Sequence, residues 1–68
     1  MEINQIKIIA ELIIKLGNLN EVTTLTGIPQ ESLINVLLGN NFEKGSVNYN
    51  VLLWLNIKIK EHGKSTNN

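Results

Sequence analysis

Apolar and polar residues follow one another along the first part of this chain with the spacing of a helix. Apolar positions recur every three or four residues from Ile3 to Leu16, which predicts a first helix over this range. The polar positions occupy only a narrow wedge of its surface. An apolar arc this broad indicates either a helix packed centrally between others or a helix that also meets a second subunit or a partner. The expected stripe consists of Ile6, Ile9, Ala10, Ile13 and Leu16, widened by Ile8 and Leu12 on one side and by Ile3 and Ile14 on the other.

A second, shorter helix is predicted at about Glu21 to Thr26. Gly17 stands where the first helix would end, and Asn18 or Asn20 can cap the second, because an Asn side chain accepts from free N–H groups of a first turn. Three of the residues in this segment are threonines, which are poor helix formers. Packing against the rest of the protein must therefore hold this helix.

A glycine-containing turn leads into a third helix. Gly27 can adopt a positive φ without a Cβ penalty, and Ile28 is biased toward extended backbone because a proline follows it. Proline suits the start of a helix, so the third helix is predicted at about Pro29 to Leu38, with Gly39 ending it. The polar residues 40–45 then form a loop.

The last segment also shows helical spacing, with Ser46 as a candidate N-cap. Residues 55–60 alternate as a strand would, but an isolated strand would have no partner here, so a helix is favoured. The expected fold is all-α, a compact bundle of about four short helices. Residues 1–61 would form one domain and residues 62–68 a flexible C-terminal tail. The apolar positions at helical spacing are Val47, Val51, Trp54, Leu55 and Ile59.

Composition limits the chemistry that the chain can perform. It has 68 residues, no cysteine and a single histidine, and its six lysines balance six glutamates. Neither a metal-ligand spacing nor a phosphate-binding glycine loop is present, so we expect no enzyme activity, no metal and no cofactor. No secretory signal and no membrane-length apolar run is visible, which favours a cytoplasmic protein.

The central segment resembles a known family of DNA-binding domains. Its residues Val22, Thr23, Gly27, Ile28, Leu33 and Val36 are similar to the helix-turn-helix pattern of the Cro and phage-repressor family, and the segment from Val22 to Leu37 also resembles the Lac repressor headpiece family. Thr23 stands where these families usually carry alanine. The resemblance implies a small, dimeric transcription regulator, a repressor of phage or plasmid type, that binds duplex DNA.

The same resemblance makes the third helix the recognition helix. A glutamine or asparagine there could pair with adenine, and a glutamate could accept from cytosine. The expected base contacts are Gln30, Glu31, Ser32, Ile34 and Asn35. The expected contacts to the DNA backbone are Asn18, Asn20, Asn40, Asn41, Lys44 and Ser46. The structural alternative is that the first set is only the solvated face of a helix.

Charge argues for a second hypothesis. The chain is neutral and has no arginine, whereas DNA-binding domains are usually basic. The alternative is a protein-interaction module with the same fold, an antirepressor or modulator that binds a larger regulator through its Ile-rich first helix or through Ile34 and Leu38. Tyr49 and Trp54 could stack on nucleic acid, but aromatics at helical spacing more often belong to a core or dimer interface. We expect a homodimer or partner interface that includes Ile8, Leu12 and Trp54.

Overall fold

The computed structural model describes residues 3–65 of the chain, and side chains from residue 3 to residue 59. This part contains four helices and no strand, which confirms an all-α fold. Helix α1 spans Gln5–Leu16, α2 Leu19–Thr26, α3 Gln30–Leu37 and α4 Val47–Ser65. No helix in the described range is both long enough and apolar enough to span a bilayer.

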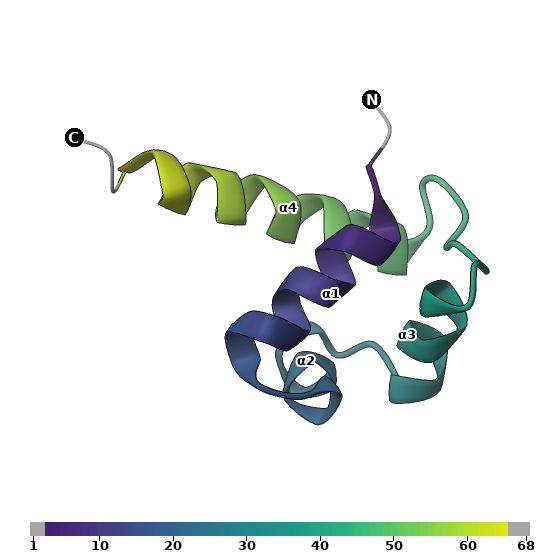
Figure 1. Cartoon of the computed structure of the whole chain (residues 1–68). Helices are drawn as coiled ribbons and strands as arrows, with labels where there is room; N and C mark the ends of the chain where they lie inside the picture. Colours follow the sequence, from purple (N-terminus) through teal and green to yellow (C-terminus); the bar gives the residue numbers. More distant parts are fainter. Residues whose placement is uncertain (1–2, 66–68) are drawn as a thin grey trace.

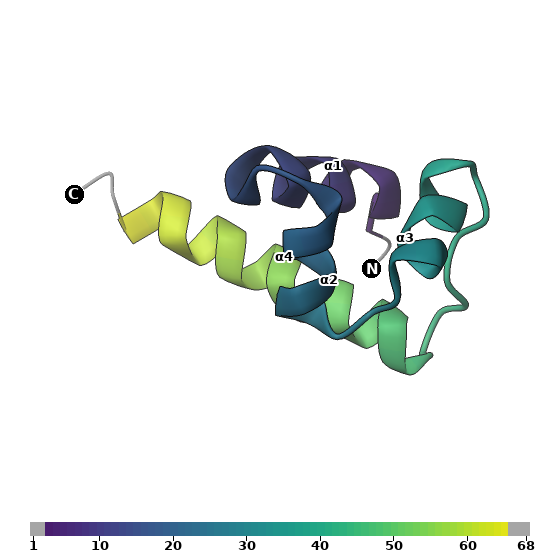
Figure 2. The same ribbon diagram turned by 90° about the horizontal axis from the view of Figure 1, so that it is seen from below.

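Helix α1 is the centre of the bundle. It packs against each of the other three helices. Figure 1 shows α4 on one side of α1, and α2 and α3 on the other. In both views the C-terminal part of α4 extends beyond the rest of the bundle (Figures 1 and 2). One end of α4 is therefore anchored in the fold while the other projects from it.

A single aliphatic core joins the four helices and the turn before α3. Every one of its nine members is less than 9% exposed. Burial of such side chains is the dominant favourable term in folding, at about 1.5–3 kcal/mol each. The core consists of Ile8, Ile9, Leu12, Val22, Ile28, Leu33, Val36, Leu52 and Leu55.

The buried face of α1 differs from the predicted stripe. Ile6 and Leu16 were expected to belong to it, but they are 42% and 38% exposed. The face that packs instead carries Ile8, Ile9 and Leu12. With apolar residues around most of the helix, sequence spacing could not select the direction of the core; the positions of the other helices selected it. Ile8 and Leu12 are 4% exposed inside the monomer, so our expectation that they form an intermolecular interface was wrong.

The helix boundaries follow from caps. Asn4 accepts from the Lys7 N–H at 3.1 Å, so α1 begins at Gln5 rather than at Ile3. Gly17 adopts a φ of 101° and ends α1, as predicted. Asn18 is the cap of α2, since its side chain accepts from the Glu21 N–H at 2.9 Å. This cap starts α2 two residues earlier than expected.

Helix α4 runs through residues 55–60, where the sequence pattern was compatible with helix or strand. The prediction of a helix is confirmed, and so is the Ser46 cap, whose Oγ accepts from the Tyr49 N–H at 3.2 Å. The helix includes residues 62–65, the first part of the expected tail. Elongation adds one hydrogen bond per residue once a helix is formed, which allows it to continue into polar sequence. The remainder of that tail, residues 66–68, lies outside the described residues.

Candidate DNA-binding face

Helices α2 and α3 are joined by a tight turn that begins at Gly27. Its φ is 76°, in the left-handed region that glycine adopts without strain, and its N–H donates to the Thr23 carbonyl at 2.8 Å. Thr26 Oγ1 accepts from the Ile28 N–H at 3.1 Å, which fixes the residue after the glycine. Ile28 itself is 1% exposed and fills the corner between the helices. The turn therefore has the glycine conformation predicted for it, and Ile28 anchors it in the core.

One face of α3 is anchored in the core and the opposite face is open. Leu33 and Val36 are fully buried. Because 3.6 residues make a turn, burying these two positions turns their neighbours outward. The residues that become exposed are Gln30, Glu31, Ile34 and Asn35; Ser32 is half-buried. Four of the five expected base contacts thus share an accessible surface, which we call the α3 face.

The expected backbone contacts divide into two groups. Asn18 and Ser46 use their side-chain oxygens to cap α2 and α4. The others are exposed and lie at the start of α2 or in the loop after α3: Asn20, Asn40, Asn41 and Lys44. Only this second group presents side chains without a capping role.

The α3 face and its flanks carry only one positive charge that could attract a phosphate. Helices α2 and α3 carry two carboxylates, Glu21 and Glu31, and no lysine. The cation nearest to α3 along the chain is Lys44 in the loop, which follows Glu43. Any phosphate contact made by this surface relies on one ammonium group, on amide side chains and on free N–H groups at helix starts.

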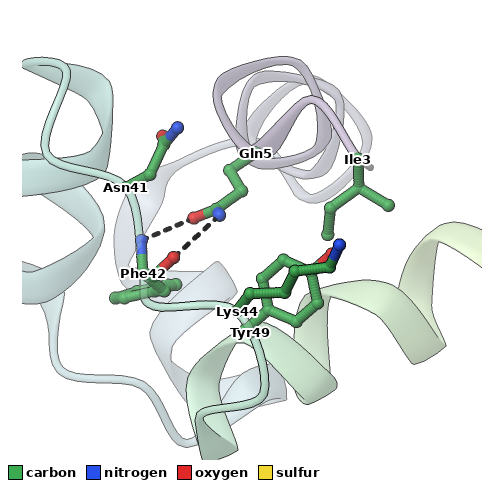
Figure 3. A pocket seen from close by; sticks show the side chains of 6 residues that line it. All are labelled: Ile3, Gln5, Asn41, Phe42, Lys44 and Tyr49. Atoms are coloured by element: carbon green, nitrogen blue, oxygen red, sulfur yellow. Dashed lines mark hydrogen bonds between the residues drawn. The ribbon is translucent and has the colours of Figure 1, made fainter. Parts of the chain in front are cut away.

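The loop that carries Lys44 is held by a residue that sequence analysis missed. Gln5 is 5% exposed, and its side-chain amide bonds both polar groups of the Phe42 backbone. Its Oε1 accepts from the Phe42 N–H at 2.7 Å, and its Nε2 donates to the Phe42 carbonyl at 3.1 Å (Figure 3). This pairing ties the start of α1 to a loop 37 residues away. The sequence did contain a signal for this role: Gln5 is a polar residue one turn before Ile8 and Ile9, on the face of α1 that is buried.

A small pocket lies beside this pairing. Its volume is about 190 Å³, and Figure 3 shows Gln5 and Phe42 on one side of it with Ile3, Lys44 and Tyr49 on the other. Tyr49 is 7% exposed and therefore belongs to the packed interior, not to a stacking surface. Trp54, in contrast, is 58% exposed. The sequence could not decide whether these two aromatic residues were buried or available for stacking, and the structure gives them different environments.

Comparisons with known proteins identify no relative. No family model, curated protein or solved structure matches the chain. Within the residues that the structure describes, no three histidine, cysteine or acidic side chains are grouped so that they could hold a metal. The α3 face and the pattern of residues 22–36 are therefore the features from which a function can be inferred.

Proposed function

We propose that this protein is a small cytoplasmic regulator that binds duplex DNA through the α3 face. The observation that supports the proposal most directly is the exposure of Gln30, Ile34 and Asn35 on a helix held from behind by Leu33 and Val36. A short helix joined by a glycine turn to a preceding helix is the unit that enters the major groove in many regulators. The resemblance of residues 22–37 to the Cro and phage-repressor family supports the same function.

The chemistry of the α3 face suits adenine–thymine pairs better than guanine. Gln30 and Asn35 can each bond adenine N6 and N7, and Ile34 can contact a thymine methyl. Glu31 can accept from cytosine N4. The chain has no arginine, the residue that most often recognises guanine. We therefore expect an operator rich in A·T pairs where α3 meets the groove.

Phosphate contacts would come from the flanks of this face. Lys44 supplies a charge, while Asn20, Asn40 and Asn41 supply neutral donors. Each phosphate neutralised by a cation steepens the salt dependence of binding by about one unit of log–log slope. With so few cations, the salt dependence of binding should be shallow.

Binding is tested by fluorescence anisotropy on random duplex and on a selected-site library, at low and at moderate salt. Gln30→Ala should cost about 1–3 kcal/mol on the selected site by removing discrimination at one base pair. Lys44→Ala should weaken binding to all duplexes alike and reduce the salt slope by about one. Lys7→Ala is the matched control, because Lys7 lines a cleft between α1 and α4 rather than the α3 face.

The decisive measurement is the one at low salt, where phosphate attraction is strongest. Absence of binding to any duplex under that condition would overturn the DNA-binding function. An equal loss from Lys7→Ala and Lys44→Ala would show that the contacts lie elsewhere on the protein.

A second candidate function is a modulator that binds a larger regulator protein. Two exposed apolar side chains favour it: Ile34 is 42% exposed and Leu38, one turn further, is 74% exposed. A protein groove would bury both, whereas DNA offers mainly methyl groups for such contacts. If this function is correct, the chain alters DNA binding by the larger regulator without binding DNA itself, and Ile34→Glu abolishes that effect.

A further inference from the structure

An apolar groove between the end of α2 and α4 takes no part in the proposed DNA contacts. Its volume is about 450 Å³. Three of its side chains are mostly exposed: Leu25 at 54%, Val47 at 78% and Trp54 at 58%. None of the lining residues is charged. They are Leu25, Thr26, Val47, Asn50, Val51, Trp54 and Leu55.

The groove exists because α4 carries two apolar faces. Leu52 and Leu55 pack into the core. Val47, Val51 and Trp54 recur at intervals of four and three residues, so they form a second stripe along the same helix. Val51 is half-buried against the core, while Val47 and Trp54 on either side of it stay exposed. A surface helix of a monomer needs one apolar stripe only. The second stripe therefore indicates a contact that the isolated chain does not make.

We propose that this groove is the surface through which two copies of the chain associate, with their α4 helices paired about a twofold axis. A twofold contact uses the same patch on both subunits, so the patch must be complementary to itself. Here one patch contains both an exposed indole, Trp54, and the hollow beside it. A groove of this volume accommodates molecules larger than an indole. Each Trp54 can thus enter the groove of the other copy.

The charge distribution is compatible with a copy as the occupant. An uncharged patch meets its own copy without like-charge repulsion, whereas a charged one would repel it. Lys58 lies next to the patch, with its Nζ 5.5 Å from the centre of the Trp54 ring. An apolar centre with a charged side chain beside it is the usual composition of a protein interface.

The exposed area agrees with a small dimer interface. At 58% exposure Trp54 offers about 140 Å² of surface. Leu25 and Val47 together add about 130 Å², taking roughly 100 Å² for a whole aliphatic side chain. Two copies therefore supply about 540 Å² of apolar surface. A weak interface of about 1,000 Å² in total is about 57% apolar, or about 570 Å². We expect a dimer with a micromolar or weaker dissociation constant.

Two measurements on the full chain test the proposal together. Sedimentation across a micromolar concentration series should show a reversible monomer–dimer equilibrium. Trp54 is the only tryptophan of the chain, so its fluorescence reports on this surface directly. Its emission should shift to shorter wavelength, and its quenching by acrylamide should decrease, over the same concentration range.

Substitutions separate this groove from other surfaces. Val47→Glu should weaken the dimer by about tenfold or more, because it places an unpaired charge in the contact. The folded state should tolerate it, since Val47 begins α4, where a negative charge is favourable. Ile14→Glu is the matched control: Ile14 is 81% exposed and lies outside the groove. Circular dichroism verifies that both variants fold.

Three results would overturn the proposal. The first is a chain that stays monomeric throughout the series. That result would count against the proposal even if the groove bound a small apolar dye. The second is a dimer that forms with no change in Trp54 emission. The third is a dimer that Ile14→Glu weakens as much as Val47→Glu does. None of these results bears on DNA binding, because the groove shares no residue with the α3 face or its flanks.

Discussion

Helix α2 contains three threonines whose hydroxyl groups have different partners, and this difference yields a sharp stability test. Thr26 Oγ1 donates to the Val22 carbonyl at 2.8 Å and also accepts from the Ile28 N–H. Thr24 Oγ1 donates to the Asn20 carbonyl at 3.2 Å on the exposed side. Thr23 Oγ1 is buried and has no hydrogen-bond partner. Thr23 is also the position at which the families that residues 22–37 resemble usually carry alanine.

Replacing the unpaired hydroxyl should stabilise the protein. A buried hydroxyl without a partner costs about 1–3 kcal/mol relative to a paired or absent one. Thr23→Val replaces that hydroxyl with a methyl group and keeps the branched shape, and valine and threonine have similar helix propensities. We expect an increase in the free energy of unfolding of about 1 kcal/mol. In a domain of this size that increase raises Tm by about 4–8 °C.

Thr26→Val is the matched control, with the same chemical change one turn along the same helix. It removes both hydrogen bonds of Thr26 Oγ1 and leaves the Ile28 N–H unpaired in the turn. This variant should lose about 1–3 kcal/mol. Urea and thermal unfolding followed by circular dichroism, at one fixed low protein concentration, measure both changes under the same conditions. A loss of stability in Thr23→Val comparable to that in Thr26→Val would refute the assignment of Thr23 as unpaired.

Two further predictions concern the elements that position the α3 face. Gln5→Leu should destabilise the fold by about 2–3 kcal/mol and increase hydrogen exchange at the Phe42 amide, because both hydrogen bonds to that backbone are lost; unchanged exchange would contradict the role of Gln5. Asn18→Ala should cost about 1 kcal/mol in urea unfolding by removing the cap of α2, whereas Asn20→Ala, with its exposed side chain, should cost much less. Equal effects of the two asparagine substitutions would show that the cap contributes nothing.

Much of the fold was predictable because local chemistry specifies it. The turn at Gly27 needs a residue that adopts a positive φ, and the ends of α1 and α4 are set by Gly17 and Ser46. These signals act over three or four residues, so they can be recognised in a sequence. The exposed positions of α3 follow equally from the spacing of Leu33 and Val36. Fold class, the order of the helices and the composition of the α3 face are consequences of such local rules.

Other features depended on contacts between distant residues. Periodicity could not show which side of the Ile-rich α1 would be buried, so Ile8 and Leu12 were assigned to an interface although they form part of the core. The pairing of Gln5 with Phe42 joins residues 37 positions apart, and no local pattern encodes it.

The sequence by itself determined the order of the helices and the glycine turns between them, and it placed the helix starts to within about two residues, since capping and glycine conformations are local properties. Only the tertiary structure decided which apolar residues became core and which stayed exposed, because that choice depends on how the helices pack. Ile8 and Trp54 illustrate the division. Both occupy apolar positions at helical spacing, yet Ile8 is part of the buried core and Trp54 lines an open groove.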